Sequence, residues 1–154
     1  MKIKKILLVL VLFVSMFVLT GCGTKKPITE EQFKTAAESY GLVVIDAIDQ
    51  MSQYKIVKSA LIGKSNDGWQ VEFYILDGNS SAKSMYDENR SIFEKYKGST
   101  TKEKYITIKE YSMYSLNSNG KYMYLCKINN TLLYANVDEQ YENDVKNFAK
   151  KIGY

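Results

Sequence analysis

The side chains able to do chemistry in this 154-residue chain are few, and the most informative count is that of histidine, which is zero. Histidine is the base of Ser-His-Asp and Cys-His nucleophilic sites and a common ligand of catalytic zinc, so the sequence excludes these classes of site. Two cysteines, Cys22 and Cys126, are too few for a thiolate metal cluster. No Gly-x-x-x-x-Gly-Lys or Gly-x-Gly-x-x-Gly motif follows a predicted strand, so the familiar nucleotide-binding loops are missing. We therefore expect no cofactor and no metal.

Neighbouring carboxylates are the remaining candidates for general acid and base chemistry. The pairs are Asp46 with Asp49, Asp87 with Glu88, and Asp138 with Glu139. Each has a plainer interpretation as a helix cap, a favourable charge in the first turn of a helix, a strand end or a solvated helix face. We therefore expect that the protein is not an enzyme. The alternative is a cell-wall-directed hydrolase that uses carboxylates and tyrosine, which needs a cleft with two carboxyl groups roughly 5 to 9.5 Å apart.

Tyrosine is abundant, with thirteen residues in the chain. Six of them cluster in the region predicted to form the last three strands: Tyr105, Tyr111, Tyr114, Tyr122, Tyr124 and Tyr134. Alternate residues of a strand share one face, so Tyr122 and Tyr124 lie on the same face as Cys126 and opposite Leu125. If helices leave that face uncovered, Tyr122 and Tyr124 form a ligand face for a glycan, a peptide or a protein. The alternative is that tyrosines simply suit a half-covered sheet.

The first 21 residues have the pattern of a signal peptide. Three lysines within residues 1–5 precede an apolar stretch from Ile6 to Leu19 that only Ser15 interrupts. As a helix this stretch spans roughly 21 Å, which is short of the roughly 30 Å hydrocarbon core of a bilayer. A cleaved signal peptide, residues 1–21, therefore fits better than a membrane-spanning anchor.

The residues that follow the apolar stretch, Leu19-Thr20-Gly21-Cys22, resemble the lipobox of bacterial lipoproteins. The resemblance implies that the thiol of Cys22 carries a diacylglyceryl group and that cleavage occurs between Gly21 and Cys22. Two acyl chains, at about 0.8 kcal/mol per buried CH₂, hold a protein on a membrane stably. We therefore expect a lipid-anchored protein at the extracytoplasmic face of the cell membrane. The alternative is an ordinary cysteine after an uncleaved membrane helix.

The chain that remains after removal of residues 1–21 is nearly neutral and has the length of one domain. The net charge of +4 falls to +1 when the three lysines of residues 1–5 leave, because 18 basic and 17 acidic residues remain. A nearly neutral chain does not favour nucleic acid as a partner. Residues 22–27 form a short tether that keeps the domain close to the bilayer, and residues 28–154 suit one domain.

The pattern of residues 28–154 predicts an α+β fold in the order αβββαβββα. Helices are expected over 29–40, 80–97 and 138–152, and six strands over 42–48, 56–63, 69–75, 105–116, 121–128 and 131–137. The strand over 105–116 is expected to bend near Lys109-Glu110. Thr29 and Gln32 have the spacing of a capping box, while Asn79 or Ser80 and then Asp138 are the expected N-caps of the later helices. Because tight turns join the strands, the sheet should be mostly antiparallel, with the helices packed on one face.

This layout, with Gly153-Tyr154 at its end, resembles a group of small uncharacterised lipoproteins of Gram-positive bacteria. The resemblance covers residues 28–154 and implies no activity. We expect a membrane-anchored lipoprotein that serves as a non-catalytic binding or protein-interaction module at the cell envelope. Its partner would be an envelope protein, a peptide or a glycan. Besides the hydrolase, a structural or assembly lipoprotein stays open as an alternative.

Overall fold

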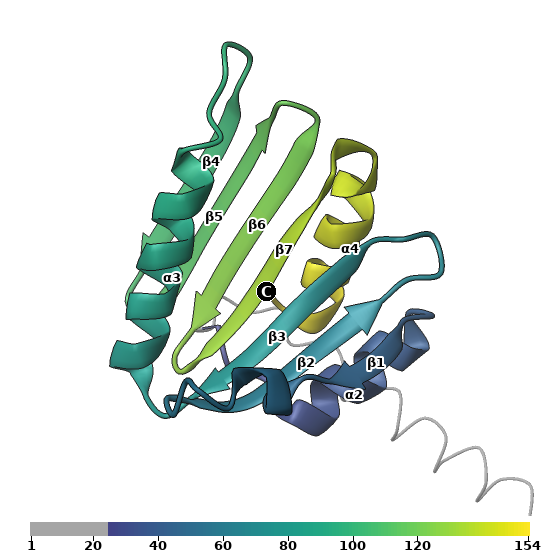
Figure 1. Ribbon diagram of the computed structural model, residues 1–154, viewed down its shortest axis with the longest axis vertical. Helices are drawn as coiled ribbons and strands as arrows, with labels where there is room; N and C mark the ends of the chain where they lie inside the picture. The colour runs from purple at the N-terminus through teal and green to yellow at the C-terminus, as the bar shows by residue number, and fades with distance from the viewer. Residues whose placement is uncertain (1–24) are drawn as a thin grey trace, which may run out of the picture.

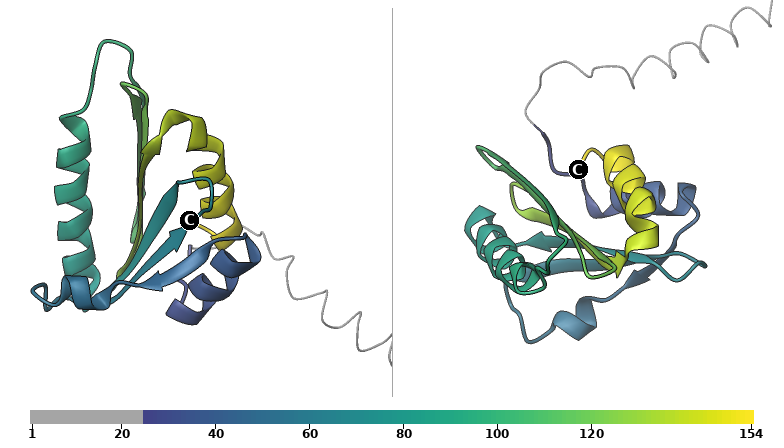
Figure 2. Two further views of the ribbon diagram at one scale, coloured as in Figure 1. Left: turned by 45° about the vertical axis from the view of Figure 1, so that its right-hand side comes forward. Right: turned by 90° about the horizontal axis from the view of Figure 1, so that it is seen from above.

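A computed structural model describes residues 25–154, which form one β-sheet with helices on both of its faces (Figures 1 and 2). The predicted signal peptide and the lipobox Leu19-Thr20-Gly21-Cys22 lie outside the described residues, so both stay predictions. Within residues 25–154, no helix has the length and apolar character needed to cross a membrane.

The sheet has seven strands in the spatial order β1-β2-β3-β7-β6-β5-β4, and every neighbouring pair is antiparallel. Its strands are β1 (Val43–Asp46), β2 (Val57–Lys64), β3 (Gln70–Leu76), β4 (Lys102–Ile108), β5 (Tyr111–Ser118), β6 (Lys121–Ile128) and β7 (Thr131–Asp138). The helices in the described residues are α2 (Glu30–Ser39), α3 (Asn79–Glu94) and α4 (Glu142–Ile152), with short 3₁₀ helices η1 (Ile48–Met51) and η2 (Glu139–Tyr141). The α+β class and the antiparallel sheet are confirmed, whereas the predicted number of strands was too low by one.

The extra strand comes from the segment predicted as a single strand over 105–116. This segment folds back on itself, because Lys109 has a φ of 53° and begins the turn between β4 and β5. Positive φ is uncommon for a residue other than glycine or asparagine. The neighbouring turns use residues that favour it, since Asn119 has a φ of 53° and Gly120 a φ of 74°. A lysine carries no such indication, and the hairpin was therefore missed.

The helices do not share one face of the sheet, as predicted, but cover both. Helices α2 and α4 bury Phe33 and Phe148 against one face, and α3 buries Tyr86 and Phe93 against the other (Figure 2). In β6 every residue from Tyr122 to Ile128 is buried. Such a continuous buried run, rather than an alternating one, is typical of a strand covered on both sides.

The ends of the helices follow the sequence in part. The capping box is formed, with the Thr29 hydroxyl accepting from the Gln32 N–H at 3.2 Å and the Gln32 side chain accepting from the Thr29 N–H at 2.9 Å. The N-cap predicted at Asn79 or Ser80 was wrong, because Gly78 precedes α3. Asp138 does occupy the N-cap position of η2, but its carboxylate pairs with Lys121 at 2.6 Å and forms no capping hydrogen bond.

The first and last described segments lie side by side. The Tyr154 hydroxyl is hydrogen-bonded to Thr131 at 2.5 Å and accepts from the N–H of Ile28 at 3.4 Å. Lys25 donates to the carbonyl of Gly153 at 2.8 Å. The segment from Lys25 to Ile28, which includes the end of the predicted tether, is therefore fixed to the C-terminal end of the domain.

Candidate functional site

The predicted ligand face at Tyr122 and Tyr124 is not exposed. Tyr122 is 2% and Tyr124 6% exposed, and both belong to the core on the side of α2 and α4. The ammonium of Lys146, from α4, lies 5.5 Å from the centre of the Tyr122 ring. Because helices cover both faces of the sheet, neither set of alternate residues in β6 is left open. The assignment of a ligand face to these tyrosines was wrong.

Four of the six predicted carboxylates are engaged by neighbouring groups. Asp87 pairs with Lys83, and the Asp46 carboxylate accepts from the N–H of Ile48 at 3.0 Å at the end of β1. Asp138 is held by Lys121, and the Glu139 carboxylate accepts from Asn117 at 3.1 Å. Among the described residues, no group of three acids or cysteines is placed to hold a metal ion.

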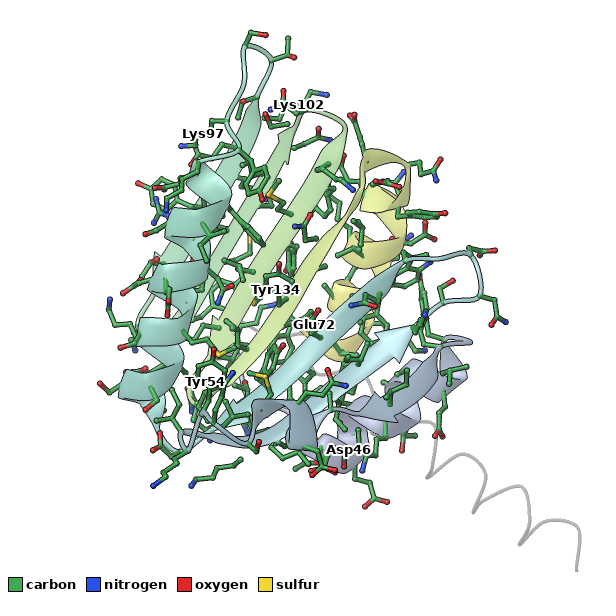
Figure 3. All side chains as sticks on the ribbon, in the orientation of Figure 1. Asp46, Tyr54, Glu72, Lys97, Lys102 and Tyr134 are labelled. Atoms are coloured by element: carbon green, nitrogen blue, oxygen red, sulfur yellow. The ribbon has the colours of Figure 1, made fainter. Side chains whose placement is uncertain are left out.

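A hollow of about 440 Å³ opens between α3, the loop after η1 and the sheet face of β2, β3 and β7. We call it the α3 groove. Its floor and walls include Met51, Tyr54, Ile56, Glu72, Tyr74, Met85, Glu88, Ile92 and Tyr134. Figure 3 shows Glu72 and Tyr134 next to each other on β3 and β7, with Tyr54 lower in the same view.

The position of α3 explains why the groove exists. The helix packs mainly on β6, and η1 packs on the β2 side of the same face, so the groove lies between the two (Figure 1). In β3, Val71 and Phe73 enter the core beneath α2 and α4, so Glu72 and Tyr74 point to the face of α3. The antiparallel register then places Glu72 directly opposite Tyr134 of β7.

The rim of the groove is unusually apolar for a surface. Tyr54 is 50%, Ile56 39% and Ile92 43% exposed. Single exposed apolar side chains are common in proteins, but several around one hollow indicate a binding surface.

Glu72 gives the floor of the groove its charge. Its carboxylate accepts from the Tyr74 hydroxyl at 2.5 Å and from the Gln70 amide at 3.1 Å. Burial, followed by the charge of Glu72, raises the pKa of Tyr74 far above its ordinary value, and the same two causes raise the pKa of Tyr134. Both phenols are therefore protonated at neutral pH and act as hydrogen-bond donors.

The carboxylate of Glu72 has no basic partner among residues 25–154, because all the ion pairs formed there involve other acids. The charged residues that line the groove are Glu72 and Glu88, and both are acidic. An apolar, aromatic hollow with uncompensated negative charge suits a ligand that combines an apolar body with a cation.

No protein-family model, curated protein or solved structure matches this chain. The α3 groove is therefore assigned from its geometry and chemistry alone.

The α3 groove was not predicted from the sequence, because the ligand face was assigned to Tyr122 and Tyr124 rather than to the tyrosines that line the groove. The alternation in β3 does place Glu72 and Tyr74 on one face, but it assigns that face to the solvent. The connection from β3 to α3 determines which part of this face α3 covers. The residues of β3 themselves do not indicate the path of that helix. A usable indication was the pair of large side chains, Met51 and Tyr54, in a loop beside a strand with an outward carboxylate.

Proposed function

We propose that this protein is a lipid-anchored lipoprotein of the extracytoplasmic membrane face whose domain is a non-catalytic binding module. Its binding site is the α3 groove, and its ligand is a peptide segment of an envelope protein that carries apolar side chains and one lysine or arginine. The observation that carries this proposal is the aromatic lining of the groove around Glu72, a carboxylate without a basic partner in the described residues. The lipobox residues Leu19-Thr20-Gly21-Cys22 support the anchoring.

The dimensions and chemistry of the groove favour a peptide. A volume of about 440 Å³ is within the usual range for ligand pockets and suits two or three side chains. A cation that enters would pair with Glu72 while lying near the rings of Tyr74 and Tyr134, and the two attractions would add. Acidic cell-wall polymers would be repelled by Glu72 and Glu88, and a neutral glycan would gain nothing from those charges.

Binding to an array of hexapeptides tests this proposal. Each peptide has apolar residues and a central lysine, glutamate or alanine, and the full chain is applied in a non-ionic detergent. We expect the lysine peptides to bind best, and Glu72→Gln to weaken their binding about tenfold, the effect of losing one charged hydrogen bond.

Glu38→Gln is the matched control, because Glu38 is an exposed acid of α2 outside the groove. It should leave binding unchanged. Equal binding of lysine and glutamate peptides, or equal effects of the two substitutions, would contradict the proposed ligand.

A hydrolase is the second candidate, because Glu72 and Glu88 line the same groove. Two observations favour binding over hydrolysis. Glu72 is already engaged by Tyr74 and Gln70, and Glu88 is exposed on α3 rather than enclosed with it. Cleavage of any array peptide that Glu72→Gln and Glu88→Gln both abolish would reverse this preference.

A further inference from the structure

A second hollow of about 650 Å³ lies on the opposite flank of α3, between that helix and the turn from β4 to β5. We call it the basic cleft. Residues 79, 80, 83, 86, 87 and 90 of α3 line it, whereas residues 84, 85, 88, 89 and 92 line the α3 groove. We propose that the basic cleft binds an oxyanion of the phosphate type, independently of the ligand in the α3 groove.

The charges that line the cleft leave an excess of positive charge. Its basic side chains are Lys83, Arg90, Lys109 and Lys127, and its acidic ones are Asp87 and Glu110. Lys83 pairs with Asp87, and the Lys127 ammonium lies 3.2 Å from a carboxylate oxygen of Glu110. Arg90 and Lys109 have no acidic partner within the lining. Arg90 pairs with Glu94 outside it at 3.0 Å, so Lys109 provides the one charge of the lining without an acidic partner among the described residues. This excess of positive charge favours an anion.

These two cations keep donors for a ligand. Arg90 uses its Nε–H on Glu94 at 3.0 Å, and a guanidinium has four further N–H groups. Its Cζ lies over the rings of Tyr105 and Tyr114, at 5.1 and 5.0 Å from their centres, and these contacts hold the guanidinium in place. Lys109 forms no ion pair with any of the described residues.

The second and independent observation is the hydroxyl of Tyr86. This residue is 3% exposed and lines the cleft, and its hydroxyl has no hydrogen-bond partner among the described residues. A buried polar group without a partner is unfavourable, so it indicates a group that a ligand satisfies. An oxyanion would accept from this hydroxyl.

The first turn of α3 adds to the same site. Asn79 and Ser80 line the cleft, and Gly78 before them provides no side chain to cap the helix. The first N–H groups of the helix are therefore available, and their partial positive charge favours an anion. Tetrahedral phosphate suits a site with ammonium, guanidinium, hydroxyl and backbone N–H donors around it.

The phosphate group could belong to a free anion or to a lipid headgroup. Both sources present the same tetrahedral oxyanion to the donors of the cleft, so the experiment must distinguish them.

Calorimetric titration of the full chain with inorganic phosphate tests the inference, with the chain in nanodiscs of phosphatidylcholine at neutral pH. We expect saturable binding with one site per chain. Tyr86→Phe should weaken it about fivefold by removing one hydroxyl donor. Lys109→Asn should weaken it by a similar factor or more, and asparagine tolerates the positive φ of this turn.

Lys150→Gln, a change of an exposed lysine of α4 outside the cleft, is the matched control and should leave phosphate binding unchanged. Circular dichroism of each variant establishes that the fold is kept. Weaker phosphate binding in nanodiscs that contain phosphatidylglycerol would identify the lipid headgroup as the occupant, and equal binding would identify the free anion. Absence of saturable binding, or equal affinities of wild type, Tyr86→Phe and Lys109→Asn, would overturn the inference.

Discussion

Lys127 is a charged side chain that the fold buries to 4% exposure. Its ammonium donates to the Glu110 carbonyl at 3.1 Å, to the Glu110 carboxylate at 3.2 Å and to the Asn129 carbonyl at 3.2 Å. The three donors of a lysine are therefore all used. By these bonds Lys127 connects the turn between β4 and β5 to the turn between β6 and β7.

Lys127→Met should lower the free energy of unfolding by about 2 kcal/mol, because it keeps the apolar volume but removes three hydrogen bonds and leaves the Asn129 carbonyl without its lysine donor, while the Glu110 carbonyl keeps the N–H of Asn129. Urea denaturation measures this change. Lys104→Met, at an exposed position of β4, is the control and should stay within about 0.5 kcal/mol of wild type. Similar values for both variants would mean that Lys127 does not hold the two turns together.

Cys126 is a second residue whose chemistry follows from its place in the core. Burial raises the pKa of its thiol to about 12. Since the thiolate is the reactive form, the thiol should resist alkylation at pH 8. We expect iodoacetamide to leave Cys126 unmodified in the folded protein and to modify it in guanidinium chloride, as measured by mass spectrometry of its peptide. Rapid labelling without denaturant would contradict this burial.

At the scale of single elements, α2 ends in a Schellman motif at Gly41. The N–H of Leu42 donates to the Ala37 carbonyl at 2.9 Å and that of Gly41 to the Glu38 carbonyl at 3.0 Å, while Gly41 has a φ of 84°. No atom lies within 4 Å of the position that a Cβ would take on Gly41. The cost of a side chain here is therefore conformational rather than steric.

Gly41→Ala should lower the free energy of unfolding by about 1 kcal/mol, and Gly41→Asn by less, because asparagine tolerates the left-handed region better. Gly78→Ser is the contrasting change. Gly78 is the N-cap of α3 with an extended φ of −176°, where serine fits and adds the missing side-chain cap. It should keep or raise stability in the same urea titration. An equal loss for Gly41→Ala and Gly78→Ser would contradict the conformational explanation.

Some turns and helix ends of this fold could be predicted from the sequence, and others could not. The capping box at Thr29 and the turn at Asn119-Gly120 were predictable, because each depends on residues close in sequence. The turn at Lys109 was not, since lysine adopts a positive φ only when the surrounding hairpin imposes it. Local patterns therefore located most elements and failed where the tertiary structure overrides the residue preference.

The candidate binding site was harder to predict from the sequence than the strands and helices. Alternation established that Tyr122 and Tyr124 share a face, but it did not show whether a helix covers that face. One indication was present in the sequence: residues 122–126 are apolar or aromatic at every position, which is the pattern of a strand buried on both sides. A strand buried on both sides leaves neither face open, so this pattern argues against Tyr122 and Tyr124 as a ligand face. It would not have located the α3 groove, which depends on the path of α3.

At the scale of the whole molecule, the buried tyrosines make the fold sensitive to alkali. Burial raises the pKa values of Tyr86, Tyr111 and Tyr154 to about 12 each. In the unfolded chain a tyrosine loses its proton near pH 10, so between about pH 10 and 12 the unfolded state binds fewer protons than the folded one. The stability that these protonated phenols contribute is complete below pH 10 and is lost as the pH rises through 12.

We therefore expect the urea midpoint to be nearly constant from pH 7 to 9 and to fall steeply above about pH 10, with tyrosinate absorbance near 295 nm appearing together with unfolding. Tyr105→Phe is the control, because Tyr105 is 62% exposed and should not alter this profile. Tyrosinate absorbance that rises fully while the fold persists would contradict the assigned burial.

The attachment of the domain to the membrane can be tested with the two cysteines of the chain as a matched pair. The proposed lipid is on Cys22, and the other thiol, that of Cys126, is enclosed in the core. In cells grown with labelled palmitate, we expect wild type and Cys126→Ala to incorporate label and Cys22→Ala to incorporate none. Because the resemblance to the lipobox implies that cleavage follows acylation of Cys22, Cys22→Ala should also lose cleavage before residue 22. A Cys22→Ala protein that is still cut after Gly21 and still remains with the membrane would disprove the lipid anchor, and it would leave the α3 groove as a binding site without an assigned location.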